Sequence, residues 1–527
     1  MNARYVASNA SPAPGWDVER VTATSRLFGA NGLRTGPDGR VYIAQVTGSQ
    51  VSALDLASGT VETISPKGGE IISPDDVAFA EDGTLIATEV MEGRVSARDT
   101  AGRTRVLRAD LPCANGITVH QGRLFVGECR DGGRLMELPL DGGAPRILLD
   151  ELPSPNAMEV GPDGMLYYPL MTANEIWRVD LDPDSPGEPQ RVAADLGVPD
   201  AVKFDADGCL VSTQVATGQV LRIDPRNGER TVLAQLNPGL DNLTFVGNRL
   251  FVSNFTGEIT EILPGGGTDT TLPGGLNWPL DLTIAGGRLH IADGTYFYAV
   301  ADDGSLQTVG MLFTPGYPGF LRGVTAVGPD EFVVTTSGGQ VGRYRPAAGD
   351  TEFLATDFDQ LYGVATHGDS IVFAELGTGT VHSLRGGTVE TLASGLDAPV
   401  GLAIGPDGAV LVAESGAGRI SRVDGGRDTV VDGLQQPQGI TVLGDALYIV
   451  DAGAKEVVEY DLNTRRRTTI ASGLPVGSPP GVQPKPLKGM PPFSGPQGPF
   501  AGITAGPDGT LYVAADGDGS VLAVRRR

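Results

Sequence analysis

The chain has 527 residues, of which 40% are hydrophobic and 20% are charged, a composition typical of a folded protein. Its net charge of −25 repels phosphate backbones and anionic lipid surfaces, so neither nucleic acid nor a membrane is an expected partner. No run of apolar residues approaches the length needed to span a bilayer. These exclusions leave proteins and small molecules, and a small-molecule substrate is the partner that we expect.

The first residues and the cysteines indicate the compartment. The N-terminal stretch "MNARYVASNASPAPGW" has neither a basic start nor an apolar core, so it does not read as a signal peptide. Three cysteines are too few for a disulfide framework and fit a reducing environment. A cytoplasmic protein is expected.

Related units recur along the whole chain, as in "ANGLRTGPDGRVYIAQ" (30–45) and "PNAMEVGPDGMLYYP" (155–169). The first six begin 44, 40, 41, 44 and 41 residues apart. Periods near forty with four short strands each are typical of β-propeller blades. The twelve units begin with the segments 30–45, 74–89, 114–128, 155–169, 199–214, 240–254, 279–293, 321–336, 361–375, 399–414, 437–451 and 500–516.

These units predict an all-β fold of two tandem six-bladed β-propellers, with twelve four-stranded blades. A single ring of twelve would leave a wide central hole, whereas small rings fill their channel with side chains. We expect each ring to be closed by a borrowed outer strand, 16–25 in the sixth blade and 267–273 in the twelfth. The expected domains are 14–264 and 265–527.

The residue just before each inner strand distinguishes the two halves. In the first six units it always carries a side-chain oxygen, and in the next six it follows no such rule. A turn role is the alternative, because Asn and Asp favour turns, but the turns are similar in both halves. The first set is Asn31, Asp75, Asn115, Asn156, Asp200 and Asp241, and the second is Leu280, Arg322, Tyr362, Val400, Gln438 and Ala501.

Inner strands line the channel of a propeller, so the first set is expected to direct six oxygen-bearing side chains at one axial point. Carboxylate and amide oxygens suit hard divalent cations. We expect calcium, with Mg, Mn or Zn as alternatives. The four histidines fall at turns or within other strands, so none is expected at this point, and a histidine-based triad is not indicated.

Carboxylates at the same face are candidates for acid or base catalysis. We name Asp200 and Asp75 from the ring, and Glu89 or Glu128 from the ends of second strands. Glu89 has an architectural alternative, because the second half places acids at the equivalent positions. These are Asp293, Glu375, Glu414 and Asp451.

The motifs "ANGI", "PNAM" and "PDAV" on three successive blades resemble the calcium-ring motifs of the gluconolactonase/regucalcin family of six-bladed propellers. That family binds one axial divalent cation and hydrolyses sugar lactones or, in relatives, phosphoesters. The resemblance implies that Asn115, Asn156 and Asp200 are ligands. The family's Glu on the first blade is replaced by Asn31, and Asp75 or Asp241 supplies the missing charge. Strictosidine-synthase-like and virginiamycin-lyase-like propellers share this architecture.

One interval is about twenty residues longer than the others and contains the Pro- and Gly-rich segment 474–500. It follows an outer strand, so it is expected on the mouth face of the second propeller. It would act either as a lid or as a stiff surface loop.

Three functions remain open from the sequence. The first is a metal-dependent hydrolase that opens a lactone or related ester at the axial cation. The second is a propeller lyase or condensing enzyme that uses channel carboxylates, and the third is a non-catalytic scaffold with a structural cation. The substrate and the oligomeric state are not encoded in any motif that we can read.

Overall fold

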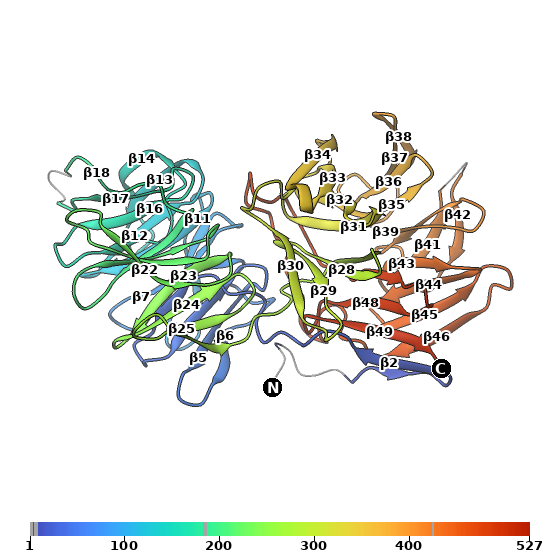
Figure 1. The fold of residues 1–527 in the computed structure, drawn as a ribbon, viewed down its shortest axis with the longest axis horizontal. Helices are drawn as coiled ribbons and strands as arrows, with labels where there is room; N and C mark the ends of the chain where they lie inside the picture. The colour runs from blue at the N-terminus through green and yellow to red at the C-terminus, as the bar shows by residue number, and fades with distance from the viewer. Residues whose placement is uncertain (1–3, 5–8, 183–186, 424–425) are drawn as a thin grey trace. The chain divides into compact units, whose positions relative to one another are not determined.

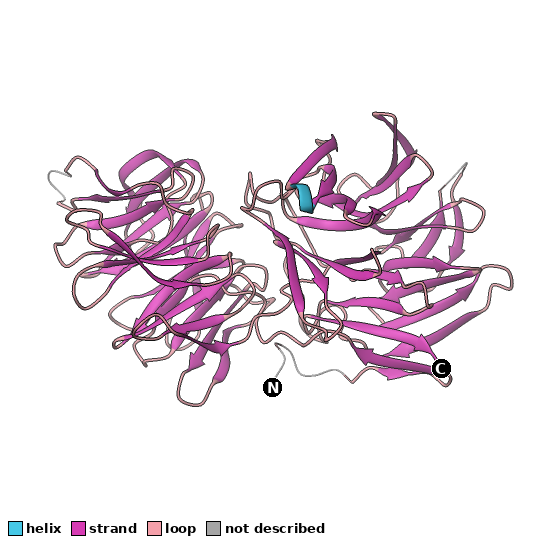
Figure 2. Ribbon diagram, viewed as in Figure 1, coloured by secondary structure: helices cyan, strands magenta, loops and turns pink. Residues whose placement is uncertain are grey.

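A computed structural model describes residues 4, 9–182, 187–423 and 426–527. Strands and short turns make up nearly all of this structure, as Figure 2 shows. The strands form twelve antiparallel sheets within the described residues. A single 3₁₀ turn, η1 (Pro346–Ala348), is the only helical element there, and no helix in that part of the chain is long and apolar enough to cross a membrane. The all-β prediction is confirmed.

The sheets form two six-bladed propellers, each numbered along the chain in Figure 1. In the first propeller, every blade consists of four consecutive strands. They are β3–β6 (Leu33–Thr35, Val41–Gln45, Gln50–Asp55, Thr60–Ser65), β7–β10 (Pro74–Phe79, Leu85–Glu89, Arg94–Arg98, Thr104–Arg108), β11–β14 (Ala114–His120, Arg123–Glu128, Asp131–Leu138, Arg146–Pro153), β15–β18 (Glu159–Val160, Leu166–Leu170, Glu175–Val179, Gln190–Ala193), β19–β22 (Pro199–Phe204, Leu210–Gln214, Gln219–Ile223, Arg230–Gln235) and β23–β26 (Leu240–Val246, Arg249–Asn254, Ile259–Ile262, Thr268–Leu272).

The second propeller has five blades of consecutive strands and one blade assembled from both ends of the chain. The consecutive blades are β27–β30 (Asp281–Ala285, Arg288–Asp293, Tyr296–Val300, Leu306–Met311), β31–β34 (Leu321–Gly328, Glu331–Thr336, Val341–Arg345, Asp350–Ala355), β35–β38 (Leu361–His367, Ser370–Glu375, Thr380–Arg385, Thr388–Ala393), β39–β42 (Pro399–Ile404, Val410–Glu414, Arg419–Arg422, Asp428–Val431) and β43–β46 (Pro437–Leu443, Ala446–Asp451, Glu456–Asp461, Arg467–Ser472). The short strand β1 (Ser11–Pro12) extends the last of these.

The assembled blade consists of β47 (Ile503–Ala505), β48 (Leu511–Ala515) and β49 (Ser520–Arg526), with β2 (Trp16–Arg20) as its outer strand. Strand β2 runs antiparallel to β49 with Val18 opposite Val524, and Figure 1 shows the two strands side by side. The N-terminal strand therefore completes the twelfth blade and not the sixth, which corrects the sequence prediction.

The strand expected to complete the twelfth blade belongs to the sixth. After β25, a tight turn at Gly265 and Gly266 returns the chain directly into β26, so the hairpin forms locally. The first propeller thus borrows no strand. Its ring closes through packing of the last blade on the first, where Leu33 and Val41 share a buried cluster with Phe251.

The chain divides into two compact units that follow this strand assignment. One unit contains Leu27–Gly274 and Gln483–Met490, and the other contains Met1–Arg26, Gly275–Val482 and Pro491–Arg527. The expected boundary near residue 265 is thereby moved to Gly274, because β26 remains with the first propeller. The insertion is shared, since 483–490 groups with the first unit and 491–500 with the second.

Trp16 anchors the N-terminal strand to the second propeller. Its side chain is 8% exposed, packs edge-on against Tyr448 with ring centroids 6.4 Å apart, and lies beneath the Arg526 guanidinium. It belongs to the buried cluster that joins the last two blades.

We predict that Trp16→Ala destabilises the second propeller by about 3 kcal/mol, because the substitution leaves a cavity beneath the closing strand. Chemical denaturation followed by fluorescence will measure the change. Phe353→Ala is the matched control, because Phe353 is 49% exposed and its removal opens no cavity. Equal effects of the two substitutions would contradict the role assigned to β2.

Candidate metal centre in the first propeller

The six aligned residues stand at or just before the start of the inner strands, where the channel of the first propeller opens. Asp75, Asn115, Asn156, Asp200 and Asp241 are buried, with exposed fractions between 2% and 7%. Asn31 is partly exposed. Buried polar side chains require partners, so their hydrogen bonds show how the ring is organised.

The ring is organised as three amide–carboxylate pairs, each joining neighbouring blades. Asn31 Nδ2 donates to Asp241 Oδ2 over 3.0 Å, and Asn156 Nδ2 donates to Asp200 Oδ2 over 3.1 Å. The third pair is formed by the side chains of Asn115 and Asp75. Each of these three carboxylates is thereby oriented by an amide from a neighbouring blade.

Two amide oxygens in the ring have no hydrogen-bond partner among the described residues. Asn31 Oδ1 accepts a hydrogen bond from the backbone N–H of Val46 over 3.1 Å. The Oδ1 atoms of Asn115 and Asn156 are buried and accept no hydrogen bond from any described residue. An unsatisfied buried acceptor is costly, so these two oxygens point to a missing donor or cation.

The carboxylates destabilise one another's ionised forms. Burial, followed by the charge of Asp76, raises the pKa of Asp75 to about 7. Burial and the charges of Asp75 and Asp76 raise the pKa of Asp200 well above its usual range. The pKa of Asp241 is also strongly raised, by burial and by Asp200 and Asp75. A nearby positive charge would favour all three ionised forms.

The residues present therefore fit a divalent cation. Two unpaired amide oxygens and three buried carboxyl groups form an all-oxygen donor set of the kind that Ca²⁺ and Mg²⁺ prefer. The described residues contain no compact group of three or more His, Cys, Asp or Glu side chains. The candidate set is mixed because half of its members are amides.

A further acid, Asp76, lies next to the ring and was missed by the sequence analysis. Its Oδ1 accepts from the N–H of Val77 over 2.8 Å and its Oδ2 accepts from the N–H of Ile117 over 3.4 Å. Burial raises its pKa, and the opposing charges of Arg34 and Lys203 moderate that rise. Asp76 joins two inner strands and adds negative charge beneath the ring.

Deeper in the channel, three charged residues form a second group that the sequence analysis also missed. Glu159 pairs with Arg34 over 3.0 Å and with Lys203 over 3.1 Å. Burial alone would raise the pKa of Glu159, but the two cations outweigh it and lower the pKa to about 2. All three stand three residues after a ring position, so the repeat alignment contained the signal.

Glu89 is engaged in blade architecture. Its carboxylate accepts from the backbone N–H of Ile72 over 2.7 Å, pairs with Arg94 over 2.6 Å, and binds the hydroxyl of Ser96. Glu414 in the second propeller has a matching set of partners. These contacts favour the architectural alternative, and Glu89 is left out of the proposal below. Glu128 pairs likewise with arginines of its own blade.

A family model described as "SMP-30/Gluconolactonase/LRE-like region" matches residues 13–254, and no curated protein matches the chain. Solved structures also match parts of this chain, at low identity. Virginiamycin B lyase from Staphylococcus aureus is 18% identical and covers 53% of this chain and 96% of its own, with a TM-score of 0.39.

Two further solved structures carry names from the same family. A gluconolactonase from Xanthomonas campestris is 18% identical and covers 48% of this chain and 97% of its own, with a TM-score of 0.39. The calcium-binding protein regucalcin from Agrobacterium tumefaciens is 21% identical and covers 45% and 85%, with a TM-score of 0.36. Over residues 13–254, which hold the six ring residues, this chain resembles the SMP-30/gluconolactonase/LRE-like family, as the sequence motifs predicted.

Proposed function

We propose that the first propeller binds one divalent cation at the ring and hydrolyses a lactone or related ester there. The observation that carries this proposal is the pair of unpaired amide oxygens, on Asn115 and Asn156, beside carboxyl groups of raised pKa. The match of residues 13–254 to a lactonase-type family supports the same activity. The substrate is a small molecule.

Asn115, Asn156 and Asp200 are the proposed principal ligands, and Asp75, Asp241 and Asn31 complete the ring. When bound, the cation supplies a Lewis acid that polarises the carbonyl oxygen of the ester. Calcium is the proposed ion, because the donors are oxygens of amides and carboxylates.

A ring carboxylate is the proposed general base. Asp200 is held by Asn156 through Oδ2, which leaves Oδ1 to accept a proton from the attacking water. Asp75 is the second candidate, because its buried carboxyl group stands in the same ring and is oriented by Asn115.

We predict that the purified full chain binds about one equivalent of Ca²⁺ and that Asn156→Ala weakens binding by about tenfold or more, because an amide ligand is lost. Calorimetric titration of chelator-treated protein will measure both. Asn463→Ala, in an exposed turn, is the control. Absence of divalent-cation binding by the wild-type protein would refute the proposal.

We predict that Asp75→Asn stabilises the metal-free protein at pH 7.5 and weakens Ca²⁺ binding. The pKa of Asp75 rises from its ordinary 3.8 to about 7 on folding, so its contribution to stability is lost as the pH rises through this interval. Asparagine removes that loss and still accepts a hydrogen bond from Asn115. Melting temperatures between pH 4 and pH 8 will show a smaller decline for the variant.

The control for this substitution is Asp269→Asn, an exposed outer-strand residue of the same propeller whose replacement removes the same charge. It is expected to change neither the pH profile nor Ca²⁺ affinity. A lower melting temperature for metal-free Asp75→Asn at pH 7.5 would contradict the prediction, because it would show that the buried Asp75 carboxylate does not destabilise the metal-free protein.

We predict that Asp200→Asn lowers kcat/KM by at least about 100-fold on a panel of aldonolactones and phosphotriesters, because the base that activates water is neutralised. Initial rates with saturating Ca²⁺ will test this. A wild-type protein that binds Ca²⁺ but hydrolyses no member of the panel would favour a structural cation. Unchanged rates in the variant would remove Asp200 from catalysis.

A further inference from the structure

The second propeller buries an arginine at its mouth. Arg322 is 1% exposed and occupies the position in the second blade of its ring that Asp75 occupies in the first propeller. Its guanidinium lies 4.3 Å from the centre of the Tyr362 ring and 5.5 Å from that of Trp278. Burial lowers the pKa of Arg322, yet a guanidinium remains protonated at neutral pH.

This buried cation has no counter-ion in the part of the chain that the structure describes. The groups that stabilise Arg322 are the Tyr362 hydroxyl and the carbonyl oxygen of Gly498, which accepts from Nη2 over 2.6 Å. Its Nη1 is buried without a hydrogen-bond partner among the described residues, and none of their carboxylates pairs with it. A buried unpaired charge is strongly unfavourable, so the geometry calls for an anion.

The segment 491–500 covers this arginine. Besides Gly498, its backbone is fixed by the Gly495 N–H, which donates to the Ser337 hydroxyl over 3.1 Å, and by the Gly498 N–H, which donates to the Tyr362 hydroxyl over 3.0 Å. Phe493 packs against Phe313 with ring centroids 5.2 Å apart. Three backbone-to-side-chain hydrogen bonds and one aromatic contact thus hold down a lid over its own propeller.

The lid itself carries a second unsatisfied group. Gln497 is 2% exposed, and neither its Nε2 nor its Oε1 has a hydrogen-bond partner among the residues described. It directly precedes Gly498, whose carbonyl contacts Arg322. The lid therefore carries an unsatisfied amide donor and an unsatisfied amide acceptor one residue before the carbonyl group that binds Arg322.

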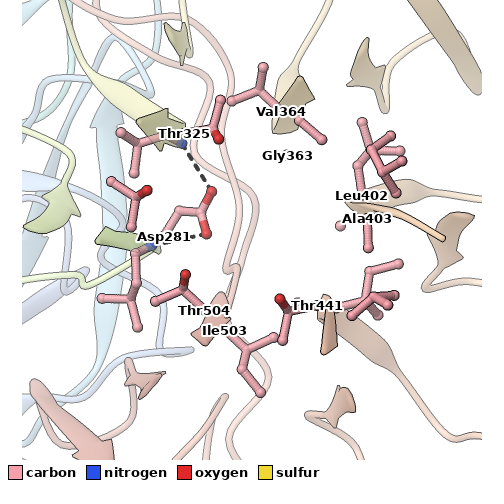
Figure 3. Close-up of a pocket in the computed structure, with 18 of the residues that line it drawn as sticks. Asp281, Thr325, Gly363, Val364, Leu402, Ala403, Thr441, Ile503 and Thr504 are labelled. Carbon is pink, nitrogen blue, oxygen red and sulfur yellow. Dashed lines mark hydrogen bonds between the residues drawn. The ribbon is translucent and has the colours of Figure 1, made fainter. Parts of the chain in front are cut away.

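Beneath the lid, the channel of the second propeller contains a cavity of about 210 Å³. Phe500, the last residue of the lid, lines this cavity and packs edge-on against Tyr362, whose ring also faces the Arg322 guanidinium. Hydroxyl groups from several inner strands surround the open centre, with one carboxyl group among them (Figure 3). The polar lining residues are Asp281, Thr283, Thr325, Thr366, Thr441 and Thr504.

We propose that the second propeller binds a polyhydroxy monocarboxylate beneath the 491–500 lid. The carboxylate binds Nη1 of Arg322 and Nε2 of Gln497, and a neighbouring hydroxyl donates to Oε1 of Gln497. The hydroxylated remainder occupies the threonine-lined cavity. A monoanion matches the single guanidinium, whereas a phosphate dianion would leave excess negative charge in a buried site.

The inference does not depend on the activity proposed for the first propeller, because different residues carry it. It is chemically compatible with that activity, since opening a hydroxylated lactone adds water across the ester and releases a hydroxycarboxylate. The second propeller would then retain a molecule of the product class.

Calorimetric titration of the full chain with sodium gluconate tests the proposal. A chelator in the buffer removes divalent ions, so the ring of the first propeller contributes no metal-dependent binding. We expect saturable binding of gluconate, and about tenfold or more weaker binding of sorbitol, acetate and phosphate. Sorbitol lacks the charge, acetate lacks the hydroxyl groups, and phosphate lacks the single negative charge. Arg322→Gln and Gln497→Leu are each expected to weaken gluconate binding by about tenfold or more.

Arg345→Gln is the matched control, because it removes the same charge from an exposed side chain of the same propeller that pairs with Asp350. Melting curves will establish that all variants are folded, and Gln497→Leu lies in the lid outside the blades. Wild-type protein that does not distinguish gluconate from sorbitol would overturn the proposal, as would full affinity in both site variants. Tighter binding of phosphate would overturn the ligand class. Loss of Ca²⁺ binding or of hydrolysis bears only on the first propeller.

Discussion

The close approach of neighbouring inner strands around each axis determines where function can reside. In the first propeller, a Cβ on Gly116 would lie 2.3 Å from the carbonyl oxygen of Asn156, and in the second a Cβ on Gly401 would lie 2.1 Å from that of Gln438. The residue that follows each mouth position must therefore be small or must bind the adjacent backbone. The inner strands bring the preceding mouth residues to a common point on the axis, where the side chains of these residues are buried together.

Two of the three exceptions to this small-residue rule support it, whereas the third, Asn242, accepts a hydrogen bond from the N–H of Leu243 in its own strand. Asp76 and Asp281 stand at the crowded position, and each directs its Oδ2 at a backbone N–H of the next inner strand, on Ile117 and Val324 respectively. Their carboxylates replace a close backbone contact with a hydrogen bond. Each therefore lies at the channel wall, where burial raises its pKa, that of Asp281 to about 7.

The repeat period was sufficient to predict the propellers and the ring, because each unit of about forty residues builds one blade with a fixed inner strand. It could not assign the outer strands. Both 16–20 and 268–272 are short segments of a length suited to an outer strand, and the tight turn before β26 and the lack of a fourth consecutive strand beside β49 decide between them. The alternative role of Glu89 was visible in the repeats, whereas the pairing of Asn156 with Asp200 depends on side-chain rotamers that no period encodes.

Both propellers bury charged groups at the mouth of the channel, and these charges have opposite signs. At the same blade position, the first propeller buries Asp75 among other acids and the second buries Arg322 beneath a lid. Neither arrangement is favourable alone, because a buried charge needs a partner to offset its lost hydration. The acidic ring offers unpaired amide oxygens that suit a cation, and the lid over the arginine carries an unpaired amide that suits an anion. Since the blade architecture is otherwise common to both, these unpaired groups distinguish the functions that we propose for the two halves, and each half is expected to gain stability when its own ligand binds.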